Sequence, residues 1–595
     1  MNCFFRQQRE NLYNCTKPYQ YVGGEFLSCN KDFDKAQVRI ALAFPDKYEI
    51  GISNLGVRVL YELVNKVDEY MADRVYAPEP DYATPTLYGV ESKRNLKNFD
   101  AVGFSLQYEM AYPTVLKMLE VSQIPYRNDY RDDLDPIVFA GGPCTYNPLP
   151  MSDFIDCFLI GDGEDVLLEF CDVLKNTKNY PRKKRLQELS KIEGVWVKGY
   201  NSKVRKRIAQ LSLETAPTSY PIPYSSSVQD RAVVEIRRGC GRMCRFCQPG
   251  HVTLPIRERS GEDIVKIAKT LVKNTGYDEY SLLSLSSNDY SNIKEVIKEL
   301  AVDFNEQKVS VSLPSQRIDG FNLELANLVQ SVRKSTMTLA PEAGSQRLRN
   351  VIKKNISEEQ ILNAALTLYE NGWSRIKLYF IAGLPTETLE DMDEMAELLS
   401  KIKYRAKLLK QEKGLKQGFD LTCTLSIFVP KPFTPFQWAG QMNLDEVTAH
   451  IKYLKEKTDK IKGVKINYHE KFVSQMEAVL TRGDDKLCNY IEALYKKGCY
   501  LDAWGEYFNK HIWQDTAKEC GLDIAQLAEK EYGLAEPLPW DFIDTGIDKT
   551  WLINEYKQAF AQGCEFVLQP TCEQKCVNCG VCPNLHTKKI LAKPY

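Results

Sequence analysis

The sequence predicts an α/β protein with two successive sheet domains and a mostly helical C-terminal region. Short apolar runs alternate with amphipathic, helix-like segments over most of the first 440 residues, a pattern typical of parallel sheets with helical crossovers. Beyond that point the pattern becomes helical and charged. We therefore expect a doubly wound, Rossmann-like domain at 1–200, a linker at 201–227, a partial or complete β/α barrel at 228–440, and a C-terminal region at 441–595.

The first domain is predicted from short, apolar strands. These lie at 38–44, 101–106, 137–140 and 154–160, and a helix is expected after Ser53. Two glycine-containing turns, GGP at 141–143 and GDGE at 161–164, come directly after strands, at the end of a parallel sheet where ligands usually bind. The same glycines also suit plain tight turns, because the sequence lacks the glycine spacing of a dinucleotide-binding fingerprint.

The barrel is predicted from a second series of alternating segments. Pro217, Pro221 and Pro223 disfavour regular structure in the linker before it. Expected strands then follow at 232–237, 280–285, 309–313, 335–339 and 376–381, with helices beginning at Gly261, Asn292 and Glu358. Five or six such units fit a partial or complete barrel.

Composition limits the class of protein. A chain of 595 residues with 44% hydrophobic content suggests three or four units at about 150 residues each. It contains neither an apolar run of about 18 residues nor a signal-peptide pattern, so we expect a cytoplasmic protein without a membrane partner. The net charge of −1 gives no overall polyanion-binding signature. Basic stretches at 182–185, 401–416 and 452–465 fit either phosphate contacts or solvated helix faces.

The strongest motif is a cysteine triplet directly after the first expected barrel strand. Cys240, Cys244 and Cys247 stand in RRGCGRMCRFC, with C-x3-C-x2-C spacing. In a reducing cytosol, clustered cysteines favour metal binding over disulfides. Three thiolates suit a [4Fe–4S] cubane, because they hold three corner irons and leave the fourth open to another ligand. A zinc site with His251 as fourth ligand is the alternative.

The triplet, with Phe246 before its third cysteine, resembles the radical SAM superfamily, whose members carry CxxxCxΦC with an aromatic Φ after the first barrel strand. The resemblance implies that the open iron binds the methionyl group of S-adenosylmethionine (SAM). It further implies that a cluster electron cleaves SAM to a 5'-deoxyadenosyl radical, so that the cofactors supply the difficult chemistry. We therefore expect a reducing partner such as flavodoxin or ferredoxin.

Four further segments resemble the superfamily, in the expected order. Ser286 and Ser287, in SLSSND, take the place of the segment that holds the SAM amine. Arg317, after the third strand, takes the place of a group that reaches the SAM carboxylate, and Glu342, in LAPEAGS, of one that contacts the ribose or amine. KLYFIAGLPTE at 377–387 is similar to a segment of methylthiotransferases and oxygen-independent coproporphyrinogen oxidases. Each segment alone also fits a turn or a helix cap.

The first domain resembles the cobalamin-binding domain of one large radical SAM class, on the evidence of the GGP and GDGE turns. Its D-x-H-x-x-G motif, which supplies an axial histidine, is absent, and all five histidines lie outside the domain. The resemblance thus implies either cobalamin bound without a protein histidine or a domain that has lost the cofactor.

The C-terminal tail carries a second cysteine cluster, C-x3-C-x2-C-x2-C, at Cys572, Cys576, Cys579 and Cys582. Zinc sites usually take paired cysteines separated by a longer loop, whereas a compact run of four is similar to ferredoxin ligands. Structural zinc, an auxiliary [4Fe–4S] cluster and a redox role without metal all remain open. We expect removal of the tail to spare the first cluster.

The sequence therefore predicts a radical SAM enzyme that abstracts hydrogen from its substrate. Methyl or sulfur transfer to RNA is favoured by the resemblance to methylthiotransferases, and a peptide or small-molecule substrate is the next candidate. The alternative from another class is a non-catalytic cobalamin or iron–sulfur sensor. The sequence specifies neither the residues that act on the substrate nor the oligomeric state.

Overall fold

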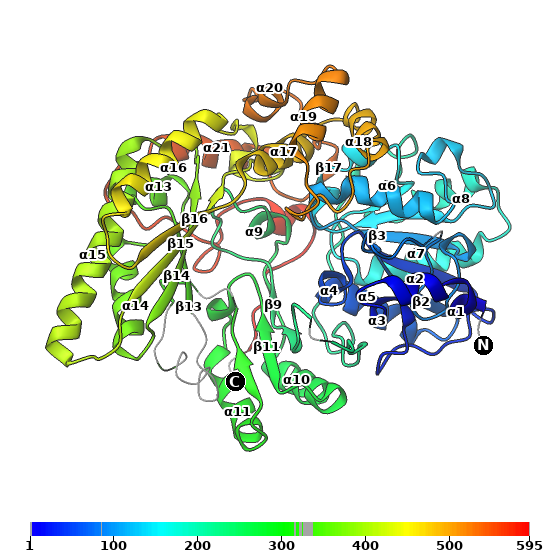
Figure 1. The fold of residues 1–595 in the computed structure, drawn as a ribbon, viewed down its shortest axis with the longest axis horizontal. Helices are drawn as coiled ribbons and strands as arrows, with labels where there is room; N and C mark the ends of the chain where they lie inside the picture. Colours follow the sequence, from blue (N-terminus) through cyan, green and yellow to red (C-terminus); the bar gives the residue numbers. More distant parts are fainter. Residues whose placement is uncertain are drawn as a thin grey trace.

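The computed structural model describes residues 3–84, 86–225, 227–314, 317–320, 324 and 337–593. Figure 1 shows the first domain (blue to cyan) on one side and the later strands β13 to β16 with their helices (green to yellow) on the other. Helices α17 to α20 run above the space between them. No helix in the described ranges is long and apolar enough to cross a membrane.

The first domain is a doubly wound sheet, as predicted. Its strand order is β2-β1-β3-β4-β5-β6, and every neighbouring pair is parallel except β5 with β6. The order reverses between β1 and β3, which is the switch point where such sheets bind ligands. The strands are β1 (Val38–Phe44), β2 (Tyr70–Tyr76), β3 (Ala101–Ser105), β4 (Ile137–Gly141), β5 (Cys157–Leu159) and β6 (Val195–Trp196).

Strand β2 was not expected, because Asp73 and Arg74 interrupt its apolar pattern. Both residues are buried but fully engaged: Asp73 accepts hydrogen bonds from the backbone amides of Glu91 and Ser92, and Arg74 pairs with Glu25 and Glu91. Paired charges can occupy a buried strand that unpaired ones could not.

Helices cover both faces of this sheet. Helices α5 and α7 pack on one apolar face, whereas α6 packs on the other. The helices of the first domain are α1 (Cys3–Gln7), α2 (Arg9–Asn14), α3 (Tyr19–Val22), α4 (Tyr48–Gly51), α5 (Leu55–Lys66), α6 (Tyr112–Val121), α7 (Glu164–Asn176) and α8 (Arg182–Leu189).

The barrel unit consists of two parallel sheets, in the orders β12-β11-β8 and β13-β14-β15-β16. No ladder joins β12 to β13 within the described residues, and the short strands β9 and β10 form an antiparallel pair. The strands are β8 (Ala232–Glu235), β9 (Arg237–Arg238), β10 (Arg257–Glu258), β11 (Glu279–Leu283), β12 (Ser310–Ser312), β13 (Met337–Glu342), β14 (Arg375–Ala382), β15 (Asp420–Ile427) and β16 (Val464–Tyr468). The first two residues of the strand expected at 335–339 lie outside the described ranges.

Strand β15 contains Cys423, which stands in an apolar, strand-like run and is buried in the core as that run predicts. Strand β16 was not predicted, because it is a partly exposed edge strand without a continuous apolar run. The sheet therefore continues past residue 440. The helices of this unit are α9 (Gln248–Val252), α10 (Gly261–Thr275), α11 (Ile293–Glu306), α13 (Gln346–Val351), α14 (Glu358–Glu370), α15 (Leu389–Lys413) and α16 (Leu444–Thr458).

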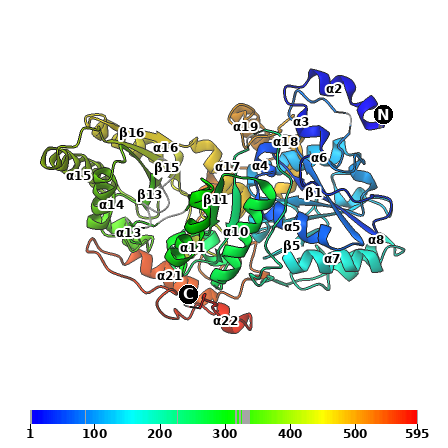
Figure 2. The ribbon, with the colours of Figure 1, turned by 90° about the horizontal axis from the view of Figure 1, so that it is seen from below.

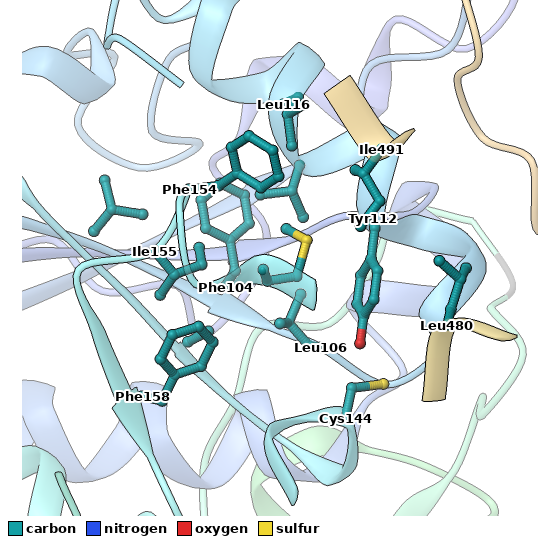
Figure 3. Packing of buried hydrophobic residues seen from close by; sticks show 14 of the residues in the cluster. Phe104, Leu106, Tyr112, Leu116, Cys144, Phe154, Ile155, Phe158, Leu480 and Ile491 are labelled. Atoms are coloured by element: carbon teal, nitrogen blue, oxygen red, sulfur yellow. The ribbon is translucent and has the colours of Figure 1, made fainter. Parts of the chain in front are cut away.

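The C-terminal region is mostly helical and joins the other two parts. Side chains of α17, α18 and α19 belong to the same apolar core as the α6 face of the first domain, and Figure 3 shows Leu480 and Ile491 beside Tyr112 and Leu116. The helices are α17 (Lys471–Arg482), α18 (Leu487–Lys496), α19 (Lys510–Glu519), α20 (Ile524–Glu529), α21 (Lys549–Phe560) and α22 (Val581–Asn584). A short pair, β7 (Val204–Arg205) with β17 (Ile543–Asp544), ties this region to the linker.

Candidate functional site

The cysteine triplet lies on the loop between β9 and α9, as expected. Gly239, which begins the loop, has a φ of +87°, and a Cβ there would lie 2.7 Å from the carbonyl oxygen of Pro255. Only glycine adopts this conformation without strain. Cys244 is buried, and Cys240 and Cys247 are half-buried, so the loop presents its thiols to the interior of the barrel unit rather than to solvent.

The three thiols are electrostatic neighbours. Burial, together with repulsion from Cys244, raises the pKa of Cys240 to about 11 and that of Cys247 to about 12. The backbone amide of Arg242 donates a hydrogen bond to the sulfur of Cys240, and that of Gly250 donates one to the sulfur of Cys247. Each bond opposes part of the rise in the pKa of its thiol. Metal coordination overrides such pKa values, because it deprotonates the thiol outright. Amide donors of this kind stabilise thiolates in iron–sulfur sites.

Glycine also keeps space open beside Cys247 Sγ and the Cys240 side chain. A Cβ at Gly250 would lie 3.3 Å from Cys247 Sγ and 4.0 Å from Cys240 Cβ. Among the described residues, no three His, Cys, Asp or Glu side chains stand in the geometry of one bound metal ion. A cubane distributes three thiolates over three irons, so it does not require the sulfurs to converge on a single centre. The donor set therefore fits a [4Fe–4S] cluster.

His251, the alternative zinc ligand, is held by the loop itself. Its Nδ1 lies 2.8 Å from the carbonyl oxygen of Cys247, and burial lowers the pKa of its imidazole to about 4. The ring is therefore neutral with its proton on Nδ1, the only nitrogen that can donate to that carbonyl. Its Nε2 has no hydrogen-bond partner among the described residues.

The predicted SAM residues from β11 and β12 lie against the cysteine loop. Ser286 donates to Asp289 at 2.6 Å, and Asp289 pairs with Arg242 of the loop. Arg242 also pairs with Asp319 at 2.9 Å. The strand ends therefore meet the loop through one half-buried charge network that the sequence did not reveal.

Arg317 and Ser287 differ in what they contact. Burial acts to lower the pKa of Arg317, but Cys244 and Asp319 outweigh it and raise that pKa, so the guanidinium stands beside the cysteine loop. Ser287 is fully buried and donates to the carbonyl oxygens of Leu282 and Pro314. These two bonds join the end of β11 to the segment after β12, so the Ser287 side chain fixes the position of these two segments relative to each other.

Glu342 and Phe246 lie on the far side of the loop. Glu342 ends β13 with a φ of +67° and pairs with Lys354 at 3.0 Å. The Lys354 ammonium opposes part of the rise in the pKa of Cys247 that burial and the other two thiols cause. Phe246 packs against an apolar cluster that includes Phe436, so its ring anchors the loop in the core. Lys354 is a further site residue that no sequence motif marked.

A separate cavity of about 350 Å³ lies at the switch point of the first domain. Most of its walls are apolar side chains and glycines from the ends of β1, β3, β4 and β5, together with α5 and α7, and charged side chains line one part of it. Both predicted turns, GGP and GDGE, contribute to it, and none of its lining residues is a histidine. A pocket of this size in a parallel sheet suits a small organic ligand or one planar part of a larger one.

Charged residues connect this cavity to the cysteine loop. Arg238, two residues before Cys240, lines the cavity and pairs with Asp162, Glu164 and Glu235. Burial acts to raise the pKa of Asp162, but Arg238 and Arg257 outweigh it and hold that pKa well below its usual range. The two candidate sites therefore share a wall of paired charges.

The tail contacts the cysteine loop directly, a contact that the sequence did not indicate. The backbone amide of Cys572 donates to the carbonyl oxygen of Gly241 at 2.8 Å. Glu573 accepts a hydrogen bond from the Gly241 amide at 2.9 Å and pairs with Arg237. Figure 2 shows this segment, in red, running along one side of the molecule from α21 to α22.

The four tail thiols share one neighbourhood. Burial raises the pKa of Cys572 to about 11, and Cys579, Cys582 and Cys576 add to the effect. The amide of Asn578 donates to Cys576 Sγ at 3.4 Å, and a second amide donates to Cys579. Cys579 is buried, whereas Cys576 is exposed.

The basic stretch at 401–416 is partly neutralised in the fold. Lys401 and Lys413 on α15 pair with Glu358 and Glu370 of α14 at 2.9 and 3.4 Å. Arg405 pairs with Glu359 at 3.0 Å. Three of the seven basic side chains of the stretch are therefore paired with carboxylates of α14.

Comparisons with known proteins agree with the geometry of the cysteine loop. The family model described as radical SAM proteins, N-terminal, matches residues 56–198, and that of the radical SAM superfamily matches residues 234–399. The uncharacterized protein MJ0966 of Methanocaldococcus jannaschii is 31% identical over 493 residues, which cover 80% of this chain and 98% of the relative. The putative methylthiotransferase MJ0865 of the same organism is 27% identical over 392 residues, covering 62% of this chain and 75% of the relative.

Two further matches are partial. The tRNA-2-methylthio-N(6)-dimethylallyladenosine synthase of Desulforamulus reducens is 27% identical over 191 residues, which cover 31% of this chain and 42% of that enzyme. The structure of the radical S-adenosylmethionine methyltransferase TsrM from Kitasatospora setae, with cobalamin and a [4Fe–4S] cluster bound, superimposes with a TM-score of 0.47 at 12% identity. That superposition covers 67% of this chain and 74% of TsrM.

Proposed function

Because the chain belongs to the radical SAM superfamily, we propose that it cleaves SAM reductively at a [4Fe–4S] cluster held by Cys240, Cys244 and Cys247 and then abstracts hydrogen from a substrate. Membership implies both cofactors. The observation that carries the proposal is the placement of three neighbouring thiols on the loop after β9, with Arg317 beside Cys244. When bound, the cluster and SAM supply a 5'-deoxyadenosyl radical.

The protein residues then have defined roles. Arg317 offers a guanidinium beside the loop, the group that best pairs with a carboxylate, and we assign it to the SAM carboxylate. Glu342 provides a negative charge for the SAM amine or ribose, with Ser286 as a further polar contact. The pairs that Arg242 makes with Asp289 and Asp319 hold the loop in register with both strand ends.

For the cavity in the first domain we propose cobalamin, bound without a protein histidine. The cavity lies at the switch point, has largely apolar and glycine walls with paired charges on one side, and none of its lining residues is a histidine. Its volume of about 350 Å³ accommodates one planar part of cobalamin, with the remainder outside. When bound, cobalamin supplies a carrier for a methyl group.

As substrate class we propose RNA, with methyl or methylthio transfer to a base. Support comes from the relatives named as methylthiotransferases and tRNA-modifying synthases.

The single electron that SAM cleavage consumes requires a reducing partner, for which we propose a flavodoxin or ferredoxin. For the tail we propose a second metal centre with four thiolate ligands, supported by the amide donors to Cys576 and Cys579.

The test of the central proposal is SAM cleavage by anaerobically reconstituted protein with dithionite. We expect 5'-deoxyadenosine from the wild type and from a Cys520→Ser control, because Cys520 is exposed and lies outside both cysteine clusters. Replacing Cys240, Cys244 and Cys247 together with Ala should abolish the product and the colour of that cluster, with the far-ultraviolet circular dichroism unchanged. Undiminished product from the folded triple variant contradicts the assignment. Wild-type protein that binds both cofactors but never cleaves SAM would support the sensor alternative.

A further inference from the structure

The tail and the cysteine loop are built around each other. The Cys572 amide and the Glu573 carboxylate bind the carbonyl and the amide of Gly241, so both polar backbone groups of one loop residue are bonded to the tail. A Cβ at Gly241 would lie 2.8 Å from both the backbone nitrogen and the Oε1 of Glu573. The loop therefore needs glycine at this position because the tail passes directly over it.

Glu573 reaches a second element of the site. Its carboxylate pairs with Arg237, which is buried and also contacts Glu258 and the carbonyl oxygen of Asp289. Asp289 is the residue that pairs with Arg242 of the cysteine loop. The Glu573 carboxylate of the tail is thus bonded directly to Gly241 of the loop, and it is linked through Arg237 and Asp289 to Arg242.

Contacts on either side of the tail cysteines hold the segment in place. Cys579 and Val581 pack with Met243 of the loop and with Ile256. Farther along, the backbone of Ile590 bonds with that of Ile256 at 2.9 Å and of Glu258 at 2.9 Å. The cysteine run therefore lies between two contacts with the same part of the barrel unit, one at Cys572 and Glu573 and the other at Ile590.

Little regular structure stabilises the cysteine run itself. Between residues 571 and 587 the only helix is α22, which has four residues, and Cys576, Gln574 and Lys575 are exposed. The segment does contain four thiols in one neighbourhood, two of them with amide donors. Metal binding is the interaction that most strongly orders such short segments.

We infer that the tail is a clamp on the SAM-cluster loop, locked by a metal centre with four thiolate ligands at Cys572, Cys576, Cys579 and Cys582, and that Glu573 is its positioning residue. The inference rests on the proposed cluster at Cys240, Cys244 and Cys247. Loss of the tail metal releases Glu573 from Gly241 and Arg237, and the first cluster then becomes labile. Zinc and a [4Fe–4S] cluster share this ligand chemistry. Because no three ligand side chains of the described residues stand around one ion position, binding must draw the four sulfurs together.

Metal analysis of the full chain tests the metal centre. Iron and zinc are measured by mass spectrometry in anaerobically prepared wild type, in a variant with the four tail cysteines changed to Ser, and in the Ala triple variant of the first site. Cys520→Ser with Cys564→Ser is the matched control, because both cysteines are exposed and lie outside the two clusters. We expect the tail variant to lose about one zinc or about four irons. The Ala triple variant should keep that metal, so failure of the first-site assignment is separately visible.

Unchanged metal content in the tail variant overturns the inference.

The clamp is tested by the rate at which a chelator removes iron from the first cluster, and by the electron paramagnetic resonance signal of that reduced cluster with SAM. Glu573→Ala should accelerate iron removal roughly tenfold or more, the effect expected for loss of hydrogen bonds to a charged group, and should alter the signal. Glu573→Gln retains an acceptor for Gly241 and should restore the signal largely. If Glu573→Ala matches the wild type in both measurements, the tail is no clamp.

Discussion

Gly241→Ala isolates the contact between the loop and the tail. The added Cβ would lie 2.7 Å from Ile256 Cδ1 and 2.8 Å from the backbone nitrogen of Glu573, closer than Cβ atoms stand in folded proteins. The Ile256 side chain can shift, whereas the Glu573 backbone moves only if the tail moves. The substitution should therefore raise the free energy of the docked tail.

The size of the effect follows from the cost of overpacking, about 1 to 3 kcal/mol. At about 1.4 kcal/mol per factor of ten, this corresponds to a roughly 5- to 150-fold increase in the population with the tail released. Hydrogen exchange followed by mass spectrometry measures that population, since the Cys572 amide is protected by its bond to Gly241. We expect peptides covering 571–582 to exchange faster by that factor.

The control is Gly418→Ala, where an added Cβ meets nothing within 4 Å. It should leave exchange of the tail within about twofold, as surface substitutions commonly change stability by at most about 0.5 kcal/mol. If Gly241→Ala gives the same tail exchange as Gly418→Ala, the tail does not press on the loop and the steric reasoning is refuted.

Three further outcomes are expected. Burial raises the pKa of Asp502 to about 6 from an ordinary value of roughly 3.9. The free energy of unfolding therefore falls by about 3 kcal/mol at most as the pH rises from the lower to the higher of these values. Asp502→Asn should raise the melting temperature at pH 8 but little at pH 4, and equal shifts at both pH values would contradict this. Arg317→Met should raise the KM for SAM at least about tenfold with smaller loss of kcat, and an unchanged KM would remove Arg317 from the SAM site. Cobalamin-loaded protein should show no nitrogen hyperfine splitting from a protein imidazole on cobalt in electron paramagnetic resonance, and such splitting would overturn the histidine-free site.

The sequence predicts those parts of the site that follow from strand order. Ser286 and Arg317 are found near the cysteine loop because side chains at the carboxyl ends of parallel strands share one edge of the fold. The cavity of the first domain was predictable for the same reason, since the GGP and GDGE turns follow β4 and β5. Local apolar patterns located the strands, and the resemblance to the radical SAM superfamily singled out Ser286 and Arg317 after them.

Contacts between distant segments were not predictable in this way. Gly241 and Glu573 are 332 residues apart, and nothing in the spacing of the tail cysteines indicates which surface they cover. Strand β2 was missed because Asp73 and Arg74 find partners that only the folded chain brings together. In each case a charged or polar group has its role set by a partner that lies outside its own strand or loop.

Arg238 explains how the two candidate sites keep a fixed relationship. It belongs to the barrel unit, two residues before Cys240, yet its partners Asp162 and Glu164 belong to the first domain and line the same cavity. A shift of one domain against the other would separate Glu164 from the Arg238 guanidinium that pairs with it, so these ion pairs favour one relative position of the two domains. A ligand in the cavity that contacts this wall is therefore held in register with the cysteine loop.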